Sequence, residues 1–151
     1  MFGATNFIGQ DKHPGKSTMV LSPSMEDYLE AIFEIEKNKR AVRVKDVSEK
    51  LGVTMSSVNG ALKNLEAKGL INHEKYEYIE LTETGTTQAS RISTRHQVIY
   101  TFLREILGVN HDTAENDACK IEHVLSPQTM KKLKRYITDE GRRVKGKSKN
   151  L

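Results

Sequence analysis

The chain of 151 residues is long enough for one compact domain or two small modules, but too short for a large enzyme scaffold. Its hydrophobic share is 36% and its charged share is 29%, so we expect an extended or oligomeric shape rather than one thick core. The net charge of +4 arises at the end of the chain, because residues 131–151 carry a balance of +7 and the first 130 residues a balance of −3. The basic end is either a solubilising tail or a non-specific contact for phosphate.

Several classes of protein are excluded by simple patterns. No apolar run approaches the roughly 18 residues that a membrane span requires, so no membrane partner is expected. Residues 1–21 contain scattered glycines and lack the basic start and apolar block of a secretory signal, which predicts a flexible extension. Cys119 is the single cysteine, so an intrachain disulfide is impossible and a reducing, cytoplasmic location is expected.

Residues 22–81 predict a winged-helix DNA-binding domain. Helical spacing begins at Ser22-Pro23-Ser24, where a serine can cap the helix and proline suits its first turn. Two short helices then flank the turn Gly52-Val53-Thr54, which is the helix-turn-helix pattern. Strand-like segments at 70–73 and 78–81 predict a β-hairpin, and a hairpin directly after a helix-turn-helix makes a wing.

The second short helix has a polar outward face, which predicts a helix that enters the major groove. Asn59 could read an adenine edge, and Lys63 could contact a phosphate or a guanine. The same face could equally be an ordinary solvated helix surface. The candidate DNA contacts are Thr54, Ser56, Ser57, Asn59 and Lys63 on this helix, and Lys75 at the tip of the wing.

Residues 82–137 predict an all-helical second domain, followed by a basic tail at 138–151. Its three helices are expected to begin at the caps Thr82 and Asp112 and at Ser126-Pro127. Three such helices cannot easily bury their apolar faces around one small winged helix. A second copy of the chain would supply the missing surface, so a homodimer is expected.

Side chains of the metal-binding types share helix faces at three places. Residues three and four positions apart on a helix lie one above the other. Thiolate, carboxylate and imidazole brought together suit a divalent transition metal. The candidate ligands are Asp27 and Glu30 on the first helix, His96 on the fourth, and Cys119, Glu122 and His123 on the fifth.

Each candidate also has an ordinary structural explanation. Asp27 follows Ser24 by three residues and could be the acidic partner of a capping box. Glu30 could be a solvated charge, His96 a core histidine with its hydrogen bonds satisfied, and Cys119 a small buried apolar residue. The Glu-His pair that follows Cys119 on the same face is the hardest to dismiss.

Three motifs, in this order, resemble the diphtheria toxin repressor family of metal-dependent transcriptional repressors, which control iron or manganese uptake. They are Ser24-Met25-Glu26-Asp27-Tyr28-Leu29-Glu30, Arg95-His96, and Asp117-Ala118-Cys119-Lys120-Ile121-Glu122-His123-Val124-Leu125-Ser126. The resemblance covers about residues 22–137. The chain is similar to the short, two-domain members, which lack the SH3-like third domain.

The resemblance implies two metal ions per subunit. A first ion would use Asp27, Glu122, His123 and an atom of Cys119, and a second would use Glu30, His96 and shared atoms of Glu122 and Cys119. This set is a hybrid, because the aspartate and glutamate of the first helix are typical of the manganese branch and the cysteine of the iron branch. Cys119 favours Fe(II), with Mn(II) as the close alternative. The iron branch's ancillary site is incomplete, since Tyr100 replaces its glutamate and Glu115 its histidine.

We therefore expect a homodimeric repressor that binds a palindromic operator in double-stranded DNA when metal bridges its two domains, without an organic cofactor. In the absence of metal, the clustered carboxylates should repel one another and the domains should lose their fixed arrangement. The alternative is a winged-helix regulator that senses an organic ligand, or oxidation of Cys119, without metal. An enzyme is not expected, because the chain has no glycine-rich phosphate loop and no nucleophile motif.

Overall fold

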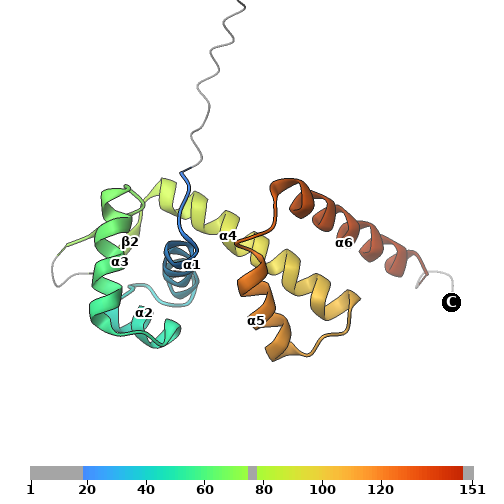
Figure 1. Ribbon diagram of the computed structural model, residues 1–151, viewed down its shortest axis with the longest axis horizontal. Helices are drawn as coiled ribbons and strands as arrows, with labels where there is room; N and C mark the ends of the chain where they lie inside the picture. Colours follow the sequence, from blue (N-terminus) through green and yellow to red (C-terminus); the bar gives the residue numbers. More distant parts are fainter. Residues whose placement is uncertain (1–18, 75–77, 148–151) are drawn as a thin grey trace, which may run out of the picture.

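The computed structural model describes residues 19–74 and 78–147, and for residues 142–147 the description covers the backbone. It is mainly helical, with one two-stranded antiparallel sheet. Figure 1 shows two groups of elements joined by the long helix α4: α1–α3 and the strands lie on one side, and α5 and α6 on the other. Among the described residues, no helix has the length and apolar character of a membrane span.

The first three helices confirm the predicted helix-turn-helix. Helix α1, Pro23–Asn38, is capped by Ser22, whose side chain accepts a hydrogen bond from the Met25 amide at 3.3 Å. Helix α2 covers Val44–Leu51 and ends at Gly52, whose φ of 65° suits glycine because it lacks a Cβ. Helix α3 covers Met55–Ala67 and is capped by Thr54, which accepts a hydrogen bond from the Ser57 amide.

The predicted hairpin is present, with shorter strands. Strand β1, Ile71–His73, pairs antiparallel with β2, Ile79–Leu81. An additional bridge joins Val42 to Ile79, so the segment before α2 extends the sheet edge. The candidate contact Lys75 falls between the two strands in the sequence and lies outside the described residues.

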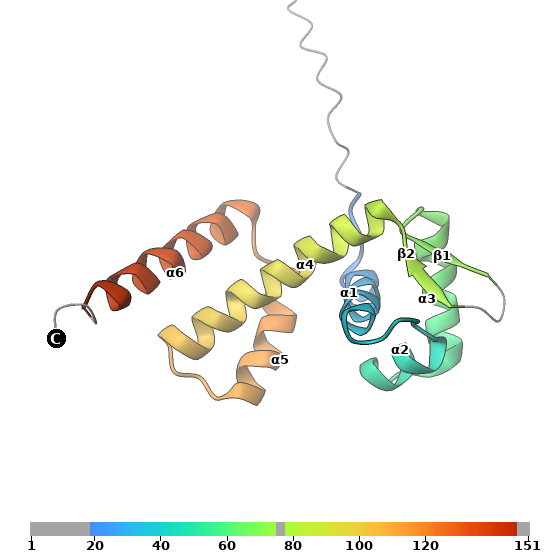
Figure 2. The same cartoon turned by 180° about the vertical axis from the view of Figure 1, so that it is seen from behind.

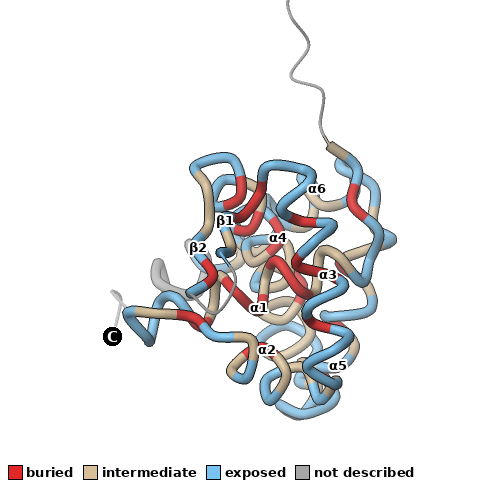
Figure 3. Tube along the Cα trace, turned by 90° about the vertical axis from the view of Figure 1, so that its left-hand side faces the viewer, coloured by how far each residue is buried: buried red, intermediate tan, exposed pale blue. Residues whose placement is uncertain are grey.

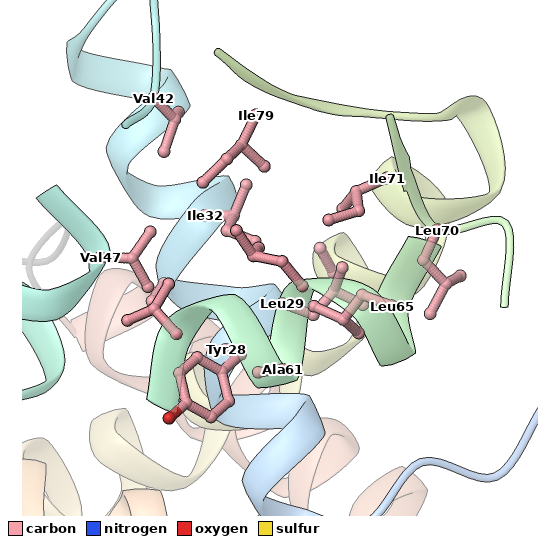
Figure 4. Close-up of a cluster of buried hydrophobic side chains, with 14 of the residues drawn as sticks. Tyr28, Leu29, Ile32, Val42, Val47, Ala61, Leu65, Leu70, Ile71 and Ile79 are labelled. Atoms are coloured by element: carbon pink, nitrogen blue, oxygen red, sulfur yellow. The ribbon is translucent and has the colours of Figure 1, made fainter. Parts of the chain in front are cut away.

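One apolar cluster holds the winged helix together. Leu29 and Ile32 of α1 are fully buried, as are Leu65 of α3 and Leu70 before β1. Figure 4 shows these side chains converging between the helices and the hairpin, and Figure 3 shows the buried segments gathered there. Burial of this apolar surface fixes the position of α3, the predicted recognition helix.

Helix α4, Glu83–Thr101, begins directly against the wing. Its first turn approaches β1 so closely that a Cβ on Gly85 would lie 1.8 Å from the Leu70 carbonyl oxygen, so this position requires glycine. Ile92 of α4 joins the winged-helix core, whereas Ile99 is buried beyond that cluster. Directly after α4, the residues Phe102–Ile106 form a π-helix.

In the second domain one predicted helix cap is wrong, and one helix extends into the segment predicted as a basic tail. Helix α5, His111–Ile121, is capped by Asn110, whose side chain accepts from the Thr113 amide; Asp112, the expected cap, lies in the first turn. Helix α6 covers Pro127–Lys147, so the predicted basic tail begins inside a helix. Lysine and arginine have good helix propensity, which allows a charged segment to continue the helix. Figure 2 shows α6 running alongside α4 and away from the winged helix.

Candidate metal centre

Glu122 lies at the centre of the candidate site. It follows the last residue of α5, where the backbone is still helical with φ −57° and ψ −30°. Its side chain is fully buried, and one carboxylate oxygen, Oε1, has no hydrogen-bond partner among the described residues. The other oxygen, Oε2, lies 2.9 Å from His96 Nδ1, whereas a buried oxygen such as Oε1 that makes no hydrogen bond is costly, because it has lost its water.

The first group of candidate ligands surrounds Glu122 from two domains. Ligand-type atoms of Asp27, Cys119, Glu122 and His123 all lie within 4.8 Å of one another. Asp27 comes from α1 of the winged helix, and the other three come from α5 and the turn that follows it. The structure therefore brings together all four residues that the family resemblance implies for a first ion.

A second group uses Glu122 again. Glu30 of α1 and His96 of α4 join it, with ligand-type atoms within the same 4.8 Å limit. Glu30 stands one turn after Asp27 on α1, so the two groups lie side by side along that helix. Cys119, which was expected to serve both ions, belongs to the first group alone by this criterion.

Two imidazole rings bridge the clustered carboxylates. His123 contacts Glu26 through Nδ1 at 2.7 Å and Asp27 through Nε2 at 2.8 Å. His96 contacts Glu122 through Nδ1 at 2.9 Å and Glu115 through Nε2 at 3.0 Å. Carboxylates only accept hydrogen bonds, so each ring donates twice when it is protonated. These contacts offset the repulsion that was expected between the acidic groups.

These contacts also raise the pKa of both histidines. The hydrogen bond to Glu122 raises the pKa of His96 to about 9 against the opposing effect of burial, and Glu115 adds to the rise. Burial lowers the pKa of His123, but its hydrogen bonds to Glu26 and Asp27 outweigh burial and raise it overall. A cation that binds to the Nδ1 or Nε2 atoms must therefore displace protons.

Burial and the neighbouring negative charges also raise the pKa values of Glu30 and Cys119. Burial and the nearby Glu122 raise the pKa of Glu30 to about 7. Burial and the surrounding carboxylates, Asp27 first among them, raise the pKa of Cys119 to about 11. A divalent cation would reverse both effects, because it favours the ionised carboxylate and the thiolate. The donor set of carboxylates, imidazoles and one thiol thus fits a divalent transition metal.

The structure also decides among the ordinary explanations of the single residues. The α1 cap is Ser22, so Asp27 is not needed for capping and faces His123 instead. His96 is bound on both ring nitrogens by carboxylates rather than packed in an apolar core. Cys119 is exposed as a residue, although its thiol is partly covered, and this is not the position of a small core residue. A cleft of about 520 Å³ opens beside these groups and is lined by Asp27, Glu30, His96, Glu115 and Cys119, among others.

Some polar residues near the centre were not singled out from the sequence. Glu26 contacts His123, and Arg95 donates to Glu26 at 2.6 Å. Both lie inside motifs that carried the family resemblance, but their spacing gives no sign of a role at the site. At the incomplete ancillary site, Glu115 contacts His96, whereas Tyr100 contacts His111 at 2.9 Å.

The candidate DNA contacts at the start and on the outer face of α3 are exposed, but the side chains of two of them already make hydrogen bonds within the protein. Ser56, Asn59 and Lys63 are exposed on the outer face. The hydroxyl groups of Thr54 and Ser57 are 3.0 Å apart and bond to one another, so both are engaged in the helix cap. Met55 is 54% exposed at the start of α3, an unusual position for a large apolar side chain, and it was not among the predicted contacts.

Comparison with protein families gives a match in both halves of the chain. Residues 20–79 match the iron dependent repressor N-terminal DNA-binding domain. Residues 82–148 match the iron dependent repressor metal-binding and dimerisation domain. These two matches together cover most of the 151 residues.

Curated relatives and solved structures agree with this match. An uncharacterized HTH-type transcriptional regulator of Methanocaldococcus jannaschii is 38% identical over 118 residues, which cover 78% of this chain and 94% of that protein. The HTH-type transcriptional regulator MntR of Bacillus subtilis is 39% identical over 105 residues, covering 70% and 73%.

A solved manganese-dependent transcriptional repressor in complex with manganese is 27% identical, with a TM-score of 0.70 over 76% of this chain. The chain spans 52% of that structure's length. The IdeR structure from T. acidophilum, 23% identical with a TM-score of 0.69, shares the fold. With a DNA-binding domain and a metal-binding and dimerisation domain in the same order, the chain belongs to the iron-dependent repressor family of metal-dependent transcriptional regulators.

Proposed function

We propose that the chain is a cytoplasmic, homodimeric repressor whose affinity for a palindromic operator rises when divalent metal binds at Glu122. The observation that carries the proposal is the buried, unpartnered Oε1 of Glu122 within ligand groups drawn from both domains. Asp27 and Glu30 belong to the helix that packs against α3, whereas His96, Cys119 and His123 belong to α4, α5 and the turn after it.

The proposed coupling follows from the charges of these residues. A bound divalent cation would supply positive charge to a cluster that holds several carboxylates. The α1 ligands and the α4–α5 ligands would then share ions, which restricts the movement of the winged helix relative to the second domain. A dimer with its two recognition helices held in place loses less entropy on binding DNA.

Dimerisation is supported by the apolar side chains that the second domain leaves exposed. They lie on the π-helix end, after α5 and on α6, and include Leu107, Val124 and Tyr136, of which Val124 is 78% exposed. A second copy would cover such a surface, as the family's dimerisation domain implies.

On the DNA side, α3 would enter the major groove. Asn59 and Lys63 remain the residues that we assign to base and phosphate contacts, with Ser56 beside them. Thr54 and Ser57 would contribute through the helix start that they cap, and Lys75 stays a proposed phosphate contact of the wing. Met55 adds an exposed apolar group that could contact a thymine methyl.

The choice of activating metal rests on one residue. The thiol of Cys119 favours Fe(II), and we place Fe(II) first for that reason, with two ions per subunit. The manganese-dependent relative and the hard oxygen donors Asp27 and Glu30 favour Mn(II). Replacing Cys119 by glutamate should shift activation towards Mn(II) and away from Fe(II), and an unchanged ranking of metals would remove the case for iron.

The deciding experiment is an anaerobic fluorescence-anisotropy titration of an operator fragment with Fe(II), Mn(II), Zn(II) and chelator. We expect the wild-type protein to bind tightly with metal and weakly with chelator. His123→Ala should abolish the metal response, whereas His111→Ala, a histidine outside both ligand groups, should retain it. Equal binding of wild type with and without chelator would refute the proposal and favour a regulator that works without metal.

A further inference from the structure

Glu26 is the neighbour of the candidate ligands that no ligand group includes. It sits on α1 directly before Asp27, and its Oε2 accepts a hydrogen bond from His123 Nδ1 at 2.7 Å. The His123 side chain is 8% exposed, and its Nε2 lies on the opposite edge of the ring, 2.8 Å from Asp27 and 3.6 Å from Glu122 Oε1. Glu26 therefore holds the ring by the nitrogen that points away from the ligand group.

Arg95 holds Glu26 in turn. Its guanidinium donates to the same Oε2 atom at 2.6 Å, and Glu26 is 17% exposed. Arg95 is on α4, next to the candidate ligand His96, so the contact joins α4 to α1. The Arg95 Nε atom is buried without a hydrogen-bond partner among the described residues, a cost that this position carries while its terminal nitrogen bonds to Glu26.

These contacts form a continuous chain, Arg95–Glu26–His123, that crosses three elements. A histidine that binds a metal through one ring nitrogen commonly donates its other N–H to a carboxylate, which fixes the tautomer and makes the ring a better ligand. Glu26 occupies that outer position here. The Arg95 guanidinium bonds to the same oxygen of Glu26 and limits the directions in which that oxygen can point.

We propose that Glu26 is the positioning residue of the first metal site, and that Arg95 acts through Glu26. Glu26 binds no metal itself. Its contact fixes the proton on His123 Nδ1 and leaves Nε2 for the ion. This inference rests on the proposed metal site, and it assigns a determinant of that site's affinity to a pair outside the ligand set.

A purely structural ion pair is the competing explanation. Loss of such a pair would lower the stability of the fold and leave the tautomer of His123 unchanged. Loss of a positioning residue would change the tautomer and the metal affinity in a protein that is still folded. The experiment must therefore measure two quantities: the metal affinity, and which nitrogen of the His123 imidazole carries the proton.

The variants are Glu26→Gln and Glu26→Ala, with Glu36→Gln as the matched control because Glu36 is an exposed glutamate on the same helix. Zn(II) and Mn(II) affinities are measured by competition with a fluorescent chelator. In the Zn(II)-loaded, ¹⁵N-labelled proteins, long-range ¹H–¹⁵N NMR correlations report which nitrogen of His123 carries the proton. Far-ultraviolet circular dichroism checks that each variant is folded.

For the wild type and Glu36→Gln we expect a protonated Nδ1 and full affinity. Glu26→Ala should weaken the first site roughly 10- to 100-fold, the range typical of a lost outer-shell partner, and should broaden or shift the His123 signals. Glu26→Gln keeps an amide oxygen that can accept from Nδ1, so it should lose less affinity than the alanine variant. Arg95→Ala should weaken the site in wild type and have little further effect in Glu26→Ala.

The inference is overturned if both Glu26 variants fold and keep the wild-type affinity and His123 signals. It is equally overturned if Glu36→Gln loses as much affinity as Glu26→Ala. His123→Ala, measured in parallel, separates this failure from that of the proposed function. If His123→Ala also binds metal normally, the metal site itself is wrong; if it alone loses the metal, only the role of Glu26 is wrong.

Discussion

The two halves of the molecule are held together by different forces. Of the twenty buried hydrophobic residues in the described part of the chain, seventeen belong to the winged-helix cluster. The other three, Ile99, Ala114 and Ala118, lie on α4 and α5, and the remaining buried residue of that region is a glutamate. The winged helix thus has an apolar core of its own. The second domain has a small apolar contact and a polar centre, so under the proposed function its order would depend on metal at Glu122 and on a partner subunit.

The largest expected effect tests the apolar half. Leu65 is fully buried in the winged-helix core, so Leu65→Ala should lower the free energy of unfolding by about 2–5 kcal/mol, through lost burial and the cavity that remains. The loss should be the same with and without Mn(II), and chemical denaturation measures it. The matched change Leu107→Ala removes the same side chain from an exposed position. It should cost the subunit about 0.5 kcal/mol or less and should show instead as weaker self-association in sedimentation.

The second-largest effect is expected from metal binding at the polar centre of the second domain. Mn(II) at about 100 times its dissociation constant should stabilise the protein by roughly 2.7 kcal/mol, because it binds the folded state and not the unfolded chain. Hydrogen exchange should show the gain in protection mainly in α5 and the adjoining part of α4, with little change in α3. Glu122→Gln, which removes the shared charge, should lose this gain. Equal new protection across α3 would contradict the division between the two halves.

A smaller effect is expected from pH. The raised pKa of His96, about 9, means that its contacts stabilise the metal-free protein fully below pH 6.5 and lose that contribution as pH rises towards 9. Binding of metal to this histidine must displace its proton in the same range. The apparent affinity of the second site should therefore rise by up to about tenfold per pH unit from 7 to 9, and then level off.

Calorimetry in two buffers of different ionisation enthalpy measures the protons released. His96→Ala provides the comparison and should release fewer protons on Mn(II) binding. A wild-type affinity that does not change between pH 7 and 9 would contradict the role given to His96.

The smallest effect on the fold is expected at the DNA surface. Lys63 is exposed on α3, so Lys63→Ala should change the free energy of unfolding by about 0.5 kcal/mol or less. The same change should reduce the slope of log affinity against log salt concentration by about 1 if the lysine neutralises one phosphate. An unchanged slope would show that Lys63 contacts no phosphate. It would not affect the contrast between the apolar core of the winged helix and the polar centre of the second domain.

The sequence predicted the elements with strong local signals and missed those that depend on distant partners. Helix α1 was predicted from Ser22-Pro23-Ser24, and helix α3 from the turn Gly52-Val53-Thr54 and apolar residues at helical spacing; both helices are confirmed. The structure selects Ser22 over Ser24 as the first cap, and it shows Thr54 as a cap that was not predicted. The cap of α5 was wrong because Asn110 and Asp112 are both good caps and only the course of the loop decides between them. The π-helix at the end of α4 has no local signal, since it depends on how that segment packs.

The candidate site shows the same division. Asp27 and Glu30 could be placed on one face of a helix by spacing alone, and the family resemblance identified their partners. The contact between Glu26 and Arg95 joins residues 69 positions apart, which no spacing rule reveals. The unpartnered oxygen of Glu122 depends on burial, and burial is a property of the folded chain rather than of any short segment.

Helix α4 has a mechanical consequence that follows from its length. Its 19 residues form a rod about 28 Å long, anchored at one end where Gly85 meets the Leu70 carbonyl and carrying His96 towards the other. A tilt of about 10° at His96, about 16 Å from Gly85 along the helix, would move the Gly85 end by about 3 Å, which is a little under one base-pair step of about 3.4 Å along the DNA axis. Small angular changes at the ligand cluster would thus be amplified into a mismatch between the two recognition helices and the spacing of their half-sites.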